Sequence, residues 1–177
     1  PIASERLLIT SGGQHGLAII TLGLLGRGDV IAIDTLTYPG FKSVAALQEL
    51  TLVPVEGRGG VMDPDDLEKA CRMRKPRAVY LTPTVHNPLG TVMDHATRMR
   101  LVEVARKHDL LIIEDAAYAF LEPDPPPSLV ALAPERTVYV GGFSKSLATG
   151  LRLGYVIAPA HQTDRLLEAI RATTWNA

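Results

Sequence analysis

Short apolar runs alternate along the chain with stretches in which apolar residues recur at helical spacing. Runs rich in Val, Ile and Leu, bounded by Gly, Pro or Asp, predict buried strands over residues 7–10, 30–33, 51–55, 78–82, 110–113, 137–140 and 153–158. Helical spacing, with Asp and Pro as start signals, predicts helices over residues 14–25, 39–50, 64–74, 94–108 and 161–172. Glycine and proline predict loops over residues 57–60, 83–90 and 123–127.

This alternation predicts the fold class. Strands with nearly continuous apolar residues, separated by helices, indicate an α/β fold with three layers, α/β/α, and a mostly parallel sheet. The 177 residues suit one domain or most of one. An element begins within a few residues of the first residue, and the last expected helix runs nearly to the final residue. We therefore expect residues 1–177 to be a large domain that is truncated at both ends.

Composition limits the kinds of binding partner and bound ion that we expect for these residues. The chain is 46% hydrophobic and 21% charged, with a formal net charge of −1, as in ordinary soluble proteins. No basic stripe is present, so we expect no nucleic-acid contact by these residues. No apolar run is long enough to span a membrane, and we take a cytoplasmic location as the default. The single cysteine excludes an internal disulfide, and the scattered histidines lack metal-ligand spacing, so we expect no metal.

Polar residues follow several of the expected strands. Ligands of parallel sheets bind beyond the carboxyl ends of the strands, so these residues are candidates for one site. Each has a plain structural interpretation when it is taken alone, such as a turn, a helix cap or a solvated lysine. Glu114 should point to the other side of its strand. The candidates are Ser11, Gly12, Gly13, Gln14, Tyr38, Asn87, Asp115, Tyr118, Ser144 and Lys145, with Arg152 seven residues beyond the lysine.

The order of these residues matches the needs of pyridoxal 5'-phosphate (PLP). The PLP aldehyde needs a lysine amine, and the pyridine nitrogen needs a carboxylate partner. The phenolic oxygen needs hydrogen-bond donors, and the ring needs a face on which to stack. The phosphate needs amides, a hydroxyl and a cation, which a glycine turn opening a helix and an arginine supply.

The sequence resembles class I/II aminotransferases of the fold-type-I PLP group over nearly its whole length. The resemblance rests on Ser11-Gly12-Gly13-Gln14, Thr37-Tyr38-Pro39-Gly40, His86-Asn87-Pro88-Leu89-Gly90, Asp115-Ala116-Ala117-Tyr118, and Ser144-Lys145 with Gly150-Leu151-Arg152-Leu153-Gly154. It implies catalytic roles for Lys145, Asp115 and Tyr118. Lys145 resembles the Schiff-base lysine, and Asp115 resembles the partner of the ring nitrogen.

The remaining roles follow from the same resemblance. Asn87 and Tyr118 resemble the pair that hydrogen-bonds the phenolic oxygen, and Tyr38 resembles the stacking residue. The phosphate site is expected to contain Gly12, Gly13, Gln14, Ser144 and Arg152. Many relatives have Ser or Thr where this chain has Gly142, so one phosphate hydrogen bond is missing. The family's substrate-carboxylate arginine lies in a C-terminal small domain that these residues do not include.

Two functions from different classes stay open. The first, which we favour, is an aminotransferase that moves an amino group from an amino acid to a 2-oxo acid. The second is the PLP- or effector-sensing and dimerisation domain of a MocR/GntR-type transcriptional regulator. The amino-acid sequence of residues 81–93 and 134–140 resembles that branch, whose winged helix-turn-helix would lie outside this chain. The family implies a homodimer for the intact protein. The amino-acid substrate or effector is not specified by these residues.

Overall fold

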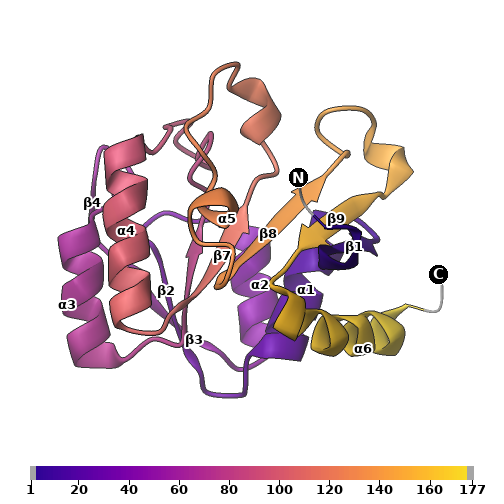
Figure 1. Ribbon diagram of the computed structural model, residues 1–177, viewed down its shortest axis with the longest axis horizontal. Helices are drawn as coiled ribbons and strands as arrows, with labels where there is room; N and C mark the ends of the chain where they lie inside the picture. Colours follow the sequence, from indigo (N-terminus) through magenta and orange to yellow (C-terminus); the bar gives the residue numbers. More distant parts are fainter. Residues whose placement is uncertain (1–2, 175–177) are drawn as a thin grey trace.

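A seven-stranded sheet forms the centre of the molecule in the computed structural model, which describes residues 3–174 (Figure 1). The strand order is β1-β9-β8-β7-β6-β2-β3. Every strand runs in the same direction except β9, which is antiparallel to both of its neighbours. The strands are β1 (Leu7–Thr10), β2 (Val30–Asp34), β3 (Thr51–Val55), β6 (Ala78–Leu81), β7 (Leu111–Asp115), β8 (Thr137–Gly142) and β9 (Gly154–Ile157).

Helices cover both faces of the sheet and give it two hydrophobic cores. One face carries α1 (Gly13–Leu24), α2 (Pro39–Leu47) and α6 (Thr163–Thr173). The other carries α3 (Pro64–Arg74), α4 (His95–Lys107) and the short α5 (Leu129–Leu132). The predicted three-layer α/β/α fold with a mostly parallel sheet is therefore confirmed. Short 3₁₀ helices occupy η1 (Ser4–Arg6), η2 (Ala119–Leu121), η3 (Thr149–Leu151) and η4 (Ala160–Gln162).

Two predictions about local structure are wrong. The expected loop over residues 57–60 includes the first strand of a small hairpin, β4 (Gly57–Arg58) with β5 (Val61–Met62). Strands of two residues are too short for any periodicity to indicate them. Helix α2 ends at Leu47 rather than near residue 50, because Glu49 adopts a φ of 54° and the amide of Leu50 bonds back to the carbonyl of Ala45.

The direction of the strands decides where polar residues gather. Strands β1, β2, β6, β7 and β8 all end at one edge of the sheet, and β9 begins there because it runs the other way. Arg152, which precedes β9, therefore lies at the same edge as residues that follow the other strands. Among residues 3–174, no helix is both long enough and apolar enough to cross a membrane.

Candidate functional site

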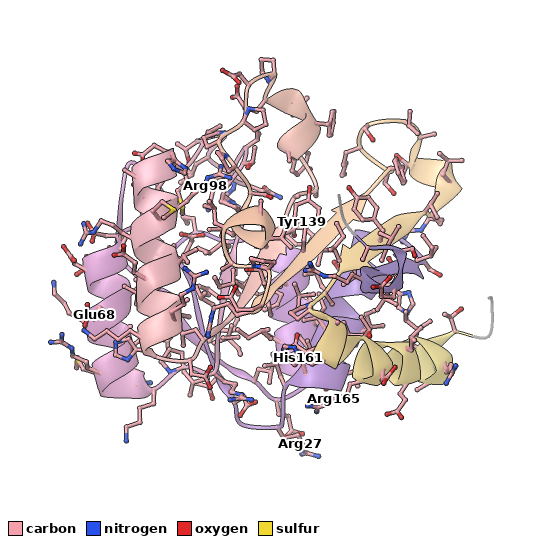
Figure 2. The ribbon with its side chains drawn as sticks, viewed as in Figure 1. Arg27, Glu68, Arg98, Tyr139, His161 and Arg165 are labelled. Atoms are coloured by element: carbon pink, nitrogen blue, oxygen red, sulfur yellow. The ribbon has the colours of Figure 1, made fainter. Side chains whose placement is uncertain are left out.

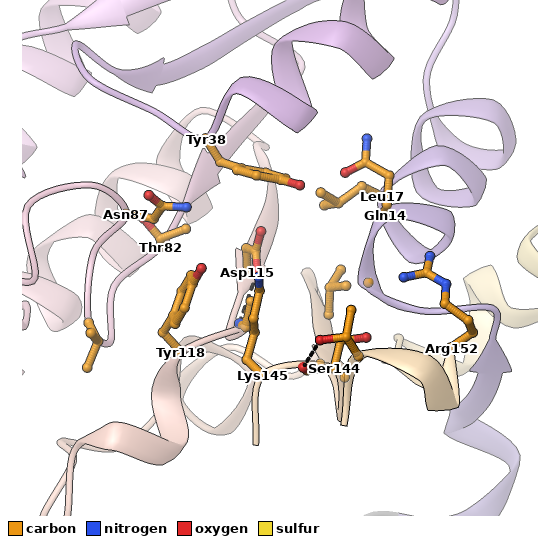
Figure 3. A pocket seen from close by; sticks show the side chains of 17 residues that line it. Gln14, Leu17, Tyr38, Thr82, Asn87, Asp115, Tyr118, Ser144, Lys145 and Arg152 are labelled. Carbon is orange, nitrogen blue, oxygen red and sulfur yellow. Dashed lines mark hydrogen bonds between the residues drawn. The ribbon is translucent and has the colours of Figure 1, made fainter. Parts of the chain in front are cut away.

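A cavity of about 210 Å³ opens at this edge of the sheet (Figure 3). Nine of the predicted site residues line it: Gly13, Gln14, Tyr38, Asn87, Asp115, Tyr118, Ser144, Lys145 and Arg152. The two other candidates, Ser11 and Gly12, do not line it, although Gly12 lies beside the guanidinium of Arg152. Gly142, where the sequence predicts that one phosphate hydrogen bond is missing, also lines it. The other lining residues were not singled out from the sequence, and they are Leu17, Thr82, Val85, Ala117, Val140, Gly141 and Thr149.

One end of the cavity is built to receive an anion. Gly12 is the N-cap of α1 and adopts a φ of 91°, which favours glycine. The first amides of α1 have no partner within the helix and point toward its positive dipole end. A Cβ atom on Gly12 would lie 3.2 Å from Nη2 of Arg152, so the glycine also leaves room for the guanidinium. Arg152 itself has a φ of 47°, a left-handed conformation uncommon for a side-chain-bearing residue.

Asp115 presents a buried carboxylate to the middle of the cavity. Its Oδ2 accepts a hydrogen bond from the Tyr80 hydroxyl at 2.7 Å, and its Oδ1 accepts one from the amide of Ala117 at 3.0 Å. Burial raises the pKa of Asp115, while these two hydrogen bonds act in the opposite direction. Within residues 3–174, no cationic side chain forms an ion pair with this carboxylate. A cationic ligand atom would therefore supply the missing charge.

Tyr80 is a site residue that the sequence did not reveal. It lies in the buried strand β6 and stacks on Phe41, with ring centroids 3.8 Å apart and planes 3° from parallel. Burial and the neighbouring Asp115 raise the pKa of its hydroxyl, which stays a hydrogen-bond donor. An aromatic residue in an apolar strand gives the same sequence signal whether it is core or site, so nothing in the pattern distinguished it.

Tyr38 and Gln14 line the wall that comes from the α1–α2 side. A Cβ atom on Gly40 would lie 2.4 Å from the Tyr38 ring, so glycine at this position gives the ring its space. Gln14 donates from Nε2 to the carbonyl of Gly40 at 2.8 Å. Its Oε1 is buried and has no hydrogen-bond partner among the described residues. This amide oxygen is thus available to a donor on a ligand.

Lys145 lies between the two ends of the cavity. Figure 3 shows Asn87 and Tyr118 on one side of the lysine and Arg152 on the other. The Lys145 Nζ is 5.8 Å from the centre of the Tyr118 ring. The arrangement therefore places a primary amine between two hydrogen-bonding side chains and an anion-binding end, with a buried carboxylate nearby.

Comparison with known proteins identifies the family. The sequence matches the family "Aminotransferase class I and II" over residues 1–175. It is 36% identical to an uncharacterized HTH-type transcriptional regulator, YdeF, of Bacillus subtilis over 94% of this chain and 36% of the regulator. It is 35% identical to (S)-3,5-dihydroxyphenylglycine transaminase of Amycolatopsis orientalis over 88% of this chain and 37% of that enzyme.

The structural comparison agrees with the sequence comparison. The crystal structure of LysN, an α-aminoadipate aminotransferase from Thermus thermophilus complexed with N-(5'-phosphopyridoxyl)-L-leucine, superposes with a TM-score of 0.89 at 31% identity. The match covers 96% of this chain and 45% of LysN. The chain belongs to the class I and II aminotransferase family, whose fold is that of the PLP-dependent aminotransferases. It spans well under half the length of the curated relatives named above.

Proposed function

We propose that this chain binds PLP and that the protein uses it to transfer an amino group from an amino acid to a 2-oxo acid. One observation supports this most strongly: a lysine, a buried carboxylate without a described cationic partner, and an anion-binding helix start line one cavity. When bound, PLP supplies an electron sink and a carrier for the amino group. The space that Gly12 leaves for the Arg152 guanidinium, beside the first amides of α1, further supports the fit.

Each residue has a distinct task in this proposal. Asp115 holds a proton on the ring nitrogen, and Tyr80 and Ala117 keep its carboxylate in place. Asn87 and Tyr118 donate hydrogen bonds to the phenolic oxygen, and Tyr38 covers a face of the ring. The amine of Lys145 would hold the cofactor covalently, and the same amine would accept the α proton of the substrate. The phosphate is held by Gly12, Gly13, Gln14, Ser144 and Arg152.

A second candidate function has its own support. The similarity to YdeF favours a regulator in which this domain senses PLP or an amino-acid-like effector and sets the geometry of a homodimer. DNA binding would then belong to residues outside this chain. Both functions use the same cofactor cavity, so turnover by the protein distinguishes them. Conversion of an amino acid to its 2-oxo acid, with release of product over many cycles, supports the enzyme.

Covalent trapping tests the cofactor assignment. The protein is titrated with PLP, reduced with borohydride and mapped by peptide mass spectrometry. We expect the pyridoxyl group on Lys145, and we expect Lys145→Ala to lose it because no amine remains in the cavity at that position. Lys42→Ala, on the exposed side of α2, is the matched control and should label normally. Trapping that survives in Lys145→Ala would contradict the assignment.

A further inference from the structure

His15 lies on the first turn of α1, directly after Gln14, yet it does not line the cavity. Its half-buried imidazole makes two contacts. Nδ1 is 3.0 Å from the backbone amide of Ser11, and Nε2 is 2.7 Å from the hydroxyl of Thr173 on α6. His15 therefore connects the turn that precedes α1 with the end of a helix more than 150 residues away in sequence.

These contacts specify the protonation state of the ring. The Thr173 hydroxyl has a single hydrogen, which it donates to the backbone carbonyl of Ala169 at 2.7 Å. It therefore accepts from Nε2–H of His15. The Ser11 amide is a donor, so Nδ1 must be the acceptor. Both contacts are satisfied only by the neutral ring with its hydrogen on Nε2, and burial lowers the pKa of His15 in the same sense.

The backbone of Ser11 is held at both its amide and its carbonyl. His15 accepts from its amide, and Nη2 of Arg152 donates to its carbonyl at 3.4 Å. The next carbonyl, that of Gly12, accepts from the Thr10 hydroxyl at 3.1 Å. The His15 imidazole and the Arg152 guanidinium thus both contact the backbone of Ser11, the residue before the N-cap of α1. A substitution or protonation of His15 therefore affects both the Ser11–Gly12 turn and the position of the Arg152 guanidinium.

We propose that neutral His15 is a positioning residue, which holds the Ser11–Gly12 turn and, through it, Arg152 in the geometry that binds the cofactor phosphate. This inference rests on the proposed PLP function. A protonated imidazole carries a hydrogen on both nitrogens, so Nδ1–H would face the Ser11 amide and the contact would break. The turn is faced by cationic Arg152 from the β8–β9 connection and by the hydroxyls of Thr10 and Thr173.

The sign of the pH effect follows from this geometry. The pKa of His15 is lowered, so the contact is present above that pKa and is lost as the pH falls through it. Affinity for the cofactor phosphate should weaken when this contact is lost. A long-range attraction between an imidazolium and the phosphate would have the opposite sign. The direction in which PLP affinity changes as the pH falls therefore distinguishes a positioning role of His15 from a direct electrostatic attraction to the phosphate.

The experiment compares PLP with pyridoxal, which lacks the phosphate, in equilibrium titrations of the wild type and two variants. In His15→Ala we expect PLP affinity to fall about 5-fold, as for the loss of one hydrogen bond, while pyridoxal affinity stays unchanged. In His15→Asn, the amide oxygen lies near the Nδ1 position and does not titrate. We expect PLP affinity within about 2-fold of wild type near pH 8. His161→Asn, at an exposed histidine of η4, is the control.

The pH series gives the decisive readout. The ratio of the wild-type Kd to the His15→Asn Kd should rise several-fold between about pH 8 and pH 5.5, and this ratio cancels the titration of the phosphate itself near pH 6. A flat ratio, a ratio that falls, or equal loss of pyridoxal binding would overturn the positioning role. Absence of PLP binding by the wild type would instead overturn the proposed function.

Discussion

Two neighbouring carboxylates on β7 have different surroundings. Asp115 reaches the cavity, whereas Glu114 points to the opposite face, as successive residues of a strand do, which confirms the expectation from the sequence. Glu114 is buried and accepts from the amides of Leu129 and Val130, at 3.1 and 2.9 Å. Burial, partly offset by these hydrogen bonds, raises the pKa of Glu114 to about 7.

The raised pKa makes stability depend on pH. A carboxyl whose pKa is higher in the folded than in the unfolded state stabilises the fold most at low pH. For Glu114, this contribution is lost as the pH rises from about 4.5 to about 7, and it amounts to roughly 3 kcal/mol. We expect Glu114→Gln to remove this slope from the free energy of unfolding, measured by urea titration across that range. The exposed Glu103→Gln should retain it.

The resemblance to class I/II aminotransferases leads us to expect a hydroxyl at the position of Gly142, where this chain has none. A Cβ atom there would lie 3.5 Å from the Gly13 amide nitrogen, an ordinary contact. We expect Gly142→Ser to fold normally and to tighten PLP binding by about 2- to 10-fold, the value of one hydrogen bond. Gly141→Ser is the contrast, because its Cβ would lie 2.3 Å from the Tyr155 ring. Unchanged PLP affinity in Gly142→Ser would show that this position does not reach the phosphate.

At the scale of elements, Arg98 on α4 fastens two loops to the helix (Figure 2). The side chain is fully buried. It donates to the carbonyl of Met93 at 2.9 Å, to the carbonyl of Pro83 at 3.0 Å and to the hydroxyl of Thr84 at 2.9 Å. Two longer bonds reach the carbonyls of Pro126 and Pro127. The loop that contains Asn87 is therefore attached to α4 at both of its ends.

Removing the Arg98 guanidinium should destabilise the fold. Arg98→Met removes all five of these hydrogen bonds, including the one to the buried carbonyl of Met93, and we expect a loss of about 3–5 kcal/mol in the free energy of unfolding. Arg100→Met is the matched control on the same helix. Among residues 3–174, Arg100 forms only an exposed pair with Asp65, so this substitution should change stability by under about 1 kcal/mol. Equal, small effects of the two substitutions, measured by urea titration, would contradict the fastening role of Arg98.

The sequence predicted the strands and helices better than it predicted the side-chain contacts between them. Apolar runs located every strand of the seven-stranded sheet, and strand direction then brought distant polar residues to one cavity. Tyr80 was not identified as a site residue because its strand is uniformly apolar. His15 was not singled out because its contact with Thr173 exists only through the packing of α6 on α1. Hydrogen bonds between distant segments leave no periodic signal in the chain.

For the whole molecule, the cavity draws on the start of α1, the N-cap of α2, the ends of several strands and the loops that follow them. A ligand that binds only the folded state stabilises all of them together. At PLP concentrations about 100 times the Kd, we expect Tm to rise by about 5–10 °C for a domain of this size. Differential scanning fluorimetry checks this, with Lys145→Ala expected to show a much smaller shift. No shift in the wild type, at concentrations where trapping succeeds, would contradict it.

The reversed strand β9 has a consequence for how the molecule reaches its native state. Strand β1 lies at the edge of the sheet and pairs with β9, so Leu7 meets Ile157 across 150 residues of sequence. During synthesis from the N-terminus, β1 leaves the ribosome before every other strand of this sheet, yet it has no partner until β9, the last of them, has been made. Contacts between such distant residues form slowly, because a long loop must close first. The anion-binding end, which follows β1, is thus assembled late, and affinity for phosphate should appear only after the helical signal in refolding.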